Sequence, residues 1–323
     1  MLSRFAESFF WLSRNVERAE TVARVLDVTY SRSIDMYAGG SWAERSWRAA
    51  LALGTLSDPA TTLVEEPAAV TVLQRCAFDT ENHSSIVSSL TIARSNAIGV
   101  RAELSTEVWE HINELYLDVQ ALSLASVTRD GPSRFLRRVR DRAQAIAGVS
   151  DATLLHVDGW NFLQLGRYFE RGYLAARMLA TMESIDDPWP EWQRLLEMCC
   201  ASVPFARASN HQPSPHDAMA FILFNPTFPR SIFFCVNEIE AALHRISETP
   251  ERTYSNEAEK QAGRLSAAFN FADISDVVNE GLPEFLTRTL TAFEELASAI
   301  QTMYFPRIPT AIAPMMRSDV LVS

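Results

Sequence analysis

Apolar residues recur at helical spacing from the start of the chain, and this feature limits the fold more than any other. They are separated alternately by three and four positions, at Phe9, Leu12, Val16, Ala19, Ala23, Leu26 and Tyr30. This spacing places them on one face of an α-helix. No alternating run flanked by hairpin turns predicts a pair of strands. The sequence therefore predicts an all-α fold.

The same periodicity and the turn signals between the apolar runs predict about twelve helices. After the first helix they are expected at 41–54, 68–78, 84–103, 106–126, 133–148, 152–183, 190–203, 215–224, 230–247, 255–272 and 283–304. We expect Pro204 to close the helix at 190–203, because the residue before a proline is disfavoured in the α region. The proline-containing residues 306–323 are expected to form an extended or mobile C-terminal tail.

Two segments of the chain match each other residue by residue. LSRNVERAETVARVL at 12–26 aligns without a gap with LGRYFERGYLAARML at 165–179. Both keep the motif Arg-x-x-Glu-Arg at the same position relative to the apolar stripe. We therefore expect an internal duplication, with two pseudo-repeated multi-helix halves at about 1–150 and 151–305. The halves are predicted to pack as one compact helical domain, 1–305.

Composition argues against several classes of protein. The formal net charge is −11, whereas a surface that binds nucleic acid needs clustered positive charge. Only 11 residues are glycine, which disfavours the glycine-rich turns of nucleotide-binding folds. The four cysteines lie in apolar stretches without a Cys-x-x-Cys pair, which is typical of buried, reduced thiols. We expect no nucleic acid partner, no metal and no cofactor.

The sequence also lacks the signals of a membrane or secreted protein. The first residues, MLSRFAESFFWLSRNVERAE, carry charges before a short apolar run and show no small-residue cleavage site, so they do not resemble a signal peptide. No apolar run reaches the ~18 residues that a membrane-spanning helix requires. We expect a cytoplasmic protein.

The repeated motif, which we call the ER motif, supplies the candidate site. Its residues are Arg14, Glu17 and Arg18 in the first copy and Arg167, Glu170 and Arg171 in the second. One copy alone is explained by weak ion pairs on a solvated helix face. Recurrence in both halves favours a functional interpretation. If the halves pack around a pseudo-twofold axis, the two faces meet across a cleft, and arginines held by glutamates form a receptor for carboxylates or phosphates.

The candidate binding residues extend beyond the two motifs. Arg24 aligns with Arg177, and Arg230 lies in the second-half segment FNPTFPRSI at 224–232. The full candidate set is Arg14, Glu17, Arg18, Arg24, Arg167, Glu170, Arg171, Arg177 and Arg230. No catalytic residue is assigned.

These segments carry a family resemblance. WLSRNVERAETVARVL together with GWNFLQLGRYFERGYLAARML resembles the two ER signatures of the bacterial alpha-E family, a helical domain of unknown function. FDTENHSSI at 78–86 and FNPTFPRSI at 224–232 resemble its Asn-Pro…Ser-Ile segments, and VWEHINELY at 108–116 resembles its Trp-Glu…Asn…Tyr helix. The resemblance covers the chain up to about Phe305.

The resemblance implies a context for the protein. Alpha-E proteins are typically encoded beside, or fused to, circularly permuted ATP-grasp ligase-like proteins and transglutaminase-like proteases. It thus implies an accessory, non-catalytic helical partner in the synthesis or modification of peptides or amides, binding the ligase or an anionic peptide-like substrate.

Two alternatives remain open at this point. In the first, the chain is an enzyme with Glu17 or Glu170 as general acid or base, which requires a raised pKa in a closed pocket. In the second, it is a structural homo-oligomer whose ER faces join subunits.

Overall fold

The computed structural model describes residues 3–35, 41–56, 68–182, 184, 186–209, 212–250 and 253–306. Within these ranges the protein contains fifteen α-helices and no β-strand, which confirms the all-α prediction. Of the expected tail at 306–323, all but Pro306 lies outside the described residues.

The first seven helices precede residue 154. They are α1 (Ser3–Asp35), α2 (Ser41–Thr55), α3 (Ala69–Leu73), α4 (Ile86–Gly99), α5 (Thr106–Gln120), α6 (Leu124–Asp130) and α7 (Pro132–Thr153). A π-helical turn at Gln74–Phe78 continues α3, and a 3-10 turn at Arg101–Glu103 follows α4.

The remaining eight helices begin after a short connection. They are α8 (Asp158–Leu179), α9 (Trp189–Met198), α10 (Ser202–Ala208), α11 (Pro215–Phe224), α12 (Ile232–Ser247), α13 (Glu257–Phe271), α14 (Ile274–Glu280) and α15 (Leu282–Tyr304).

Three short helices, α6, α10 and α14, were not expected, and they account for the difference from the predicted twelve. The predicted helix at 106–126 is divided, because Ser123 adopts an extended conformation and caps α6. Asp273 caps α14 in the same way. Their side chains accept hydrogen bonds from backbone N–H groups that would otherwise lack partners at a helix start. Periodicity alone does not reveal such interruptions.

The expectation that Pro204 closes the preceding helix is wrong. α9 ends at Met198, and Cys200 takes a left-handed φ of 56°. A new helix, α10, then begins at Ser202 and contains Pro204 in its first turn. Proline is tolerated there because the first N–H groups of a helix have no intrahelical partner.

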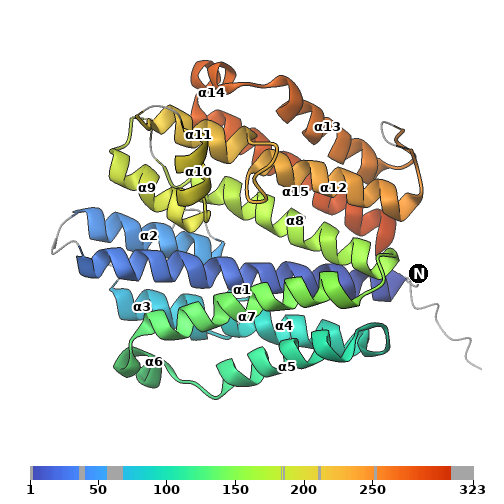
Figure 1. Ribbon diagram of the computed structural model, residues 1–323, viewed down its shortest axis with the longest axis horizontal. Coiled ribbons are helices and arrows are strands. Elements are labelled where there is room, and N and C mark those ends of the chain that lie inside the picture. Colours follow the sequence, from blue (N-terminus) through green and yellow to red (C-terminus); the bar gives the residue numbers. More distant parts are fainter. Residues whose placement is uncertain are drawn as a thin grey trace, which may run out of the picture.

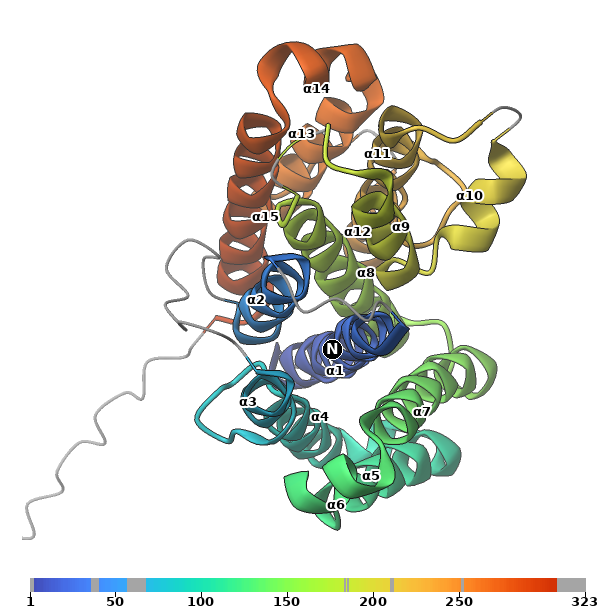
Figure 2. The same ribbon diagram turned by 90° about the vertical axis from the view of Figure 1, so that its left-hand side faces the viewer.

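Helix α1 runs through the middle of the molecule. It packs against α4 and α7 on one side and against α8 on the other, and α8 in turn packs against α12 and α15. Figure 1 shows α1 between these two groups of helices, and the view from its end in Figure 2 shows α4, α5 and α7 on one side of it and α8, α12 and α15 on the other.

Because it has neighbours on all sides, α1 buries its polar face as well as its apolar one. The predicted stripe is buried from Phe9 to Leu26. Seven charged or amide residues of the same helix are also at most 9% exposed, namely Arg14, Asn15, Glu17, Arg18, Glu20, Arg24 and Asp27. Buried charges require partners, and those partners define the candidate site. Separately, none of the helices in the described ranges is long and apolar enough to cross a membrane.

Candidate functional site

The site forms where α8 lies directly on α1. At Gly166 of α8 a Cβ atom would overlap the backbone oxygen of Phe10 and the hydroxyl of Ser13, both on α1. The absence of a side chain therefore lets the two helices approach closely. This contact brings the ER motifs of the two helices next to each other.

Glu170 of α8 is held by both arginines of the first ER motif. Arg14 Nε donates to Glu170 Oε2 at 2.7 Å, and Arg18 Nε donates to Oε1 at 2.6 Å. The glutamate is fully buried. The guanidinium of Arg14 also stacks against the rings of Phe169 and Trp11, at 4.4 and 4.8 Å from their centroids. Cation–π contact of this kind stabilises a buried arginine.

Glu17 of α1 makes the reciprocal interaction. Arg171 of the second ER motif donates to its two carboxylate oxygens, through Nε at 2.6 Å and Nη2 at 2.9 Å. Arg230, from the connection before α12, approaches Glu17 Oε1 at 3.4 Å. Each ER glutamate is thus bound by two arginines, of which at least one belongs to the ER motif of the other helix.

Glu20 extends this network along α1. Its Oε1 accepts hydrogen bonds from Arg24 and, at 3.1 Å, from Gln144, and it forms an ion pair with Arg230 at 3.2 Å. Across the whole network, three glutamates face five arginines: Glu17, Glu20 and Glu170 against Arg14, Arg18, Arg24, Arg171 and Arg230. The network therefore carries an excess of positive charge.

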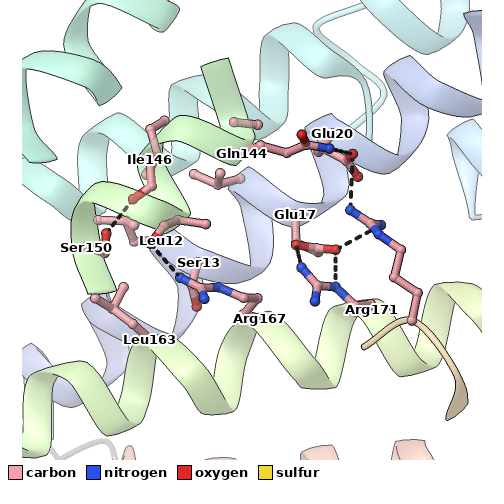
Figure 3. A pocket seen from close by; sticks show the side chains of 14 residues that line it. Leu12, Ser13, Glu17, Glu20, Gln144, Ile146, Ser150, Leu163, Arg167 and Arg171 are labelled. Atoms are coloured by element: carbon pink, nitrogen blue, oxygen red, sulfur yellow. Dashed lines mark hydrogen bonds and ion pairs between the residues drawn. The ribbon is translucent and has the colours of Figure 1, made fainter. Parts of the chain in front are cut away.

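A small cavity of about 40 Å³ adjoins the Glu17 and Glu20 side of the network. Figure 3 shows Glu17 of α1 and Arg171 of α8 directed toward each other, whereas Arg167 of α8 is directed away from them. Its remaining wall is mostly apolar and comes from α1, α7 and α8, with Leu12, Val16, Ala143, Ile146, Ala147 and Leu163. The exposed Gln144 lies at its edge.

The electrostatics of the glutamates do not suit proton transfer. Burial alone would raise the pKa of Glu17, but Arg171 and Arg230 outweigh it and lower this pKa to about 2. Arg18 and Arg14 likewise overcome the effect of burial and lower the pKa of Glu170. A general acid at neutral pH needs the opposite shift. The network also makes Glu17 and Glu170 unavailable for joining subunits, because both are bound within one chain.

Two further candidate residues occupy different surroundings. Arg167 lines the cavity but pairs with Asp151, at 3.2 Å, and not with Glu17. Arg177 lies near the end of α8 and lines a separate hollow of about 490 Å³ between α2, α8 and α15. The structure therefore brings the predicted residues together except for Arg177.

Four residues of the site were missing from the predicted set: Glu20, Gln144, Asp151 and Gly166. Glu20 follows Glu17 by three positions on the same helix face, a spacing that identifies it as a neighbour. Gln144 and Asp151 come from α7, and the sequence carries no signal that α7 packs against this part of α1.

The other polar groups singled out in the sequence have structural roles. Cys76, Cys199 and Cys235 are buried free thiols, and burial raises the pKa of each to about 12. In the segment at 108–116, Asn113 accepts a hydrogen bond from Arg94 of α4 at 2.8 Å. Trp109 and Tyr116 stack on the same guanidinium. These contacts hold α5 against α4.

Comparison with known proteins places this geometry in a family. A family model described as a predicted alpha-helical domain with a conserved ER motif matches residues 1–305. The chain belongs to the Alpha-E family. The match spans both ER motifs and every helix described above.

The curated relatives that it matches are uncharacterized proteins of Mycobacterium bovis and of two strains of Mycobacterium tuberculosis. Each is 24% identical over 277 residues, which cover 77% of this chain and 31% of the relative. The chain thus spans about a third of the length of these relatives. No solved structure matches it.

The ion pair between Glu17 and Arg171 predicts that the free energy of unfolding falls in acid. Because the folded-state pKa of Glu17 is lowered to about 2 from an ordinary value of 4.5, its contribution is complete above about pH 4.5 and is lost as the pH falls toward 2. We expect Glu17→Gln to reduce the slope of the unfolding free energy against pH in this acidic range, by up to ~1.4 kcal/mol per pH unit where the slope is steepest.

Urea unfolding between pH 6 and pH 2.5 measures this slope. Glu257→Gln is the control, because Glu257 is more than half exposed and pairs with Arg264 at 3.3 Å on the surface. An unchanged slope in Glu17→Gln would show that folding does not lower the pKa of Glu17.

Proposed function

We propose that this protein is a non-catalytic helical binding protein that works with an ATP-grasp-type amide ligase and a transglutaminase-like protein. In this role it takes part in the synthesis or modification of peptides or amides, and it holds an anionic, peptide-like ligand through its paired Arg/Glu faces. The observation that carries the proposal is the reciprocal network between α1 and α8, in which five arginines share three glutamates.

Binding suits this network better than acid–base catalysis does. The lowered pKa values of Glu17 and Glu170 keep both carboxylates ionised at neutral pH. Ionised, hydrogen-bonded glutamates fix the arginines in place, and fixed guanidinium groups recognise carboxylates and phosphates with little loss of entropy on binding. The excess of positive charge favours an anion.

The length of the relatives supports the proposal that the domain works with a partner protein. In the mycobacterial proteins this domain covers 31% of the chain, so more than half of each relative lies outside it. We infer that the domain works together with a protein of the kind that makes up that remaining part. The resemblance to alpha-E proteins implies that this partner is ATP-grasp-like.

We also propose that the domain arose by duplication. The ER motifs exchange partners, with Arg18 on Glu170 and Arg171 on Glu17. Ser85 and Ser231, which align in the two halves, each cap the helix that packs on the ER helix of its half. The helices α6 and α14 have the same length and are each followed by a glycine, with φ of 90° and 98°.

Co-expression with the ATP-grasp-like protein encoded in the same genome tests the partnership. We expect the two proteins to elute as one complex in size-exclusion chromatography, with a light-scattering mass equal to the sum of whole-number copies. A stable interface of this kind buries at least ~1,000 Å². Separate elution of both folded proteins at micromolar concentration would contradict the proposal.

A further inference from the structure

One of the side chains that line the cavity beside α1 carries an unsatisfied hydrogen-bond acceptor. Glu20 is 2% exposed and lines the cavity. Its Oε1 accepts two hydrogen bonds and forms an ion pair with Arg230, whereas its buried Oε2 accepts no hydrogen bond. An ionised oxygen that is buried without a donor is costly. A complementary ligand therefore has to bring a proton donor to this position.

Two arginines of the same cavity are only loosely engaged. Arg230 lies 3.4 Å from Glu17 and 3.2 Å from Glu20. Arg167 donates over 3.2 Å to Asp151, 3.3 Å to Gln164 and 3.4 Å to the Ala147 carbonyl. Charge-assisted hydrogen bonds are usually ~2.7–2.9 Å long, and Arg171 binds Glu17 at the comparable distances of 2.6 and 2.9 Å. Arg167 and Arg230 thus retain capacity to donate to a ligand.

The charge and volume of the cavity limit the class of ligand further. On this side of the network Arg24, Arg171 and Arg230 face only Glu17 and Glu20, which favours an anion. A volume of about 40 Å³ accommodates a group of a few heavy atoms, since one water needs ~10–15 Å³ by the same measure.

We propose that this cavity binds an oxyanion that carries a proton, of the hydrogen phosphate class. Arg230 and Arg167 donate to its oxygens, and its P–OH group donates to Glu20 Oε2. The proposal names the ligand chemistry of the anion-binding face and rests on the function proposed above. It also predicts selectivity: sulfate has no proton near neutral pH, so its oxygen would meet the Glu20 carboxylate with repulsion.

Phosphate binding by the whole chain, measured by equilibrium dialysis with labelled inorganic phosphate at pH 7, tests this. We expect phosphate to bind at least about tenfold more tightly than sulfate, because a hydrogen bond to a charged group is replaced by a buried acceptor without a donor. In Glu20→Gln the amide can donate to sulfate, and we expect the preference to fall below about threefold.

Glu191→Gln is the matched control. Glu191 is also buried, pairs with Arg194 at 2.9 Å, and has one carboxylate oxygen without a partner, but it does not line this cavity. Its variant should keep the wild-type preference. If Glu20→Gln does not fold, Ala147→Leu provides a second test, because it fills the cavity, leaves the Glu20 side chain unchanged and should abolish phosphate binding.

Binding of phosphoserine tests whether the phosphate group in the cavity comes from the free ion or from a phosphorylated partner. The second pKa of a phosphomonoester is ~6, so phosphoserine should bind more tightly at pH 5.5 than at pH 7.5 if its monoester group occupies the site. Binding of inorganic phosphate alone would assign the site to the free ion.

The outcomes are distinguishable from those of the partner experiment. Equal affinity for phosphate and sulfate, or no binding of either, overturns the cavity assignment even if the complex with the ATP-grasp-like protein forms. Selective phosphate binding that depends on Glu20 supports the assignment even if that complex does not form.

Discussion

Replacing Glu170 with glutamine should lower the free energy of unfolding by about 3–5 kcal/mol, the range seen when one member of a buried ion pair is removed. The side chain of Glu170 is fully buried and is the shared partner of Arg14 and Arg18. A neutral amide would leave both guanidinium groups in a largely dehydrated interior without a counter-charge. Urea denaturation at neutral pH measures the loss.

Two comparisons make this prediction specific. Asp130→Asn removes a partner of the exposed Arg129, and we expect a change below about 1 kcal/mol because exposed ion pairs contribute little. Replacing Arg14, Arg18 and Glu170 together with apolar residues should restore much of the stability, as in other buried ion-pair clusters. A small effect of Glu170→Gln would show that these charges are not desolvated.

Gly166→Ala is expected to have the other large effect. A Cβ atom at this position would overlap the backbone oxygen of Phe10, which cannot move without displacing α1. Overpacking in a close-packed interior usually costs ~1–3 kcal/mol, and we expect at least the upper value because the obstacle is backbone. Thermal unfolding followed by circular dichroism measures the change.

Gly148→Ala is the matched control on α7. Apart from the adjoining residues and backbone of α7 itself, no atom lies within 4 Å of a Cβ built at Gly148, so only the helix propensity changes. Alanine is favoured over glycine inside a helix by ~1 kcal/mol, and this variant should be more stable than the wild type. If both variants are destabilised alike, the close approach of α8 to α1 is not the reason.

Much of the fold could be predicted because its helices follow from local patterns. The apolar stripe from Phe9 to Leu26 is buried as expected. Helix ends were less predictable. Gly131 and Gly281 precede long helices with φ of 90° and 98°, and the short helices before them depend on single capping residues that periodicity does not reveal.

Part of the candidate site could be predicted because a motif recurs in the sequence. Recurrence of Arg-x-x-Glu-Arg identified the residues that meet between α1 and α8, although the duplication itself remains a proposal. Which charges pair was not predictable, because it depends on the relative position of two helices. Arg167 illustrates this: it aligns with Arg14, yet it pairs with Asp151 of α7 and not with Glu17.

The burial of α1 has a consequence for the order in which this protein acquires its structure during synthesis. Charges of this helix are neutralised by Glu170, Arg171 and Arg230, the first of which leaves the ribosome roughly 7–30 seconds after α1 at usual elongation rates. Until then α1 cannot bury its arginines and glutamates without penalty. Its final packing therefore waits for the second half of the polypeptide, and neither half would be expected to mature alone.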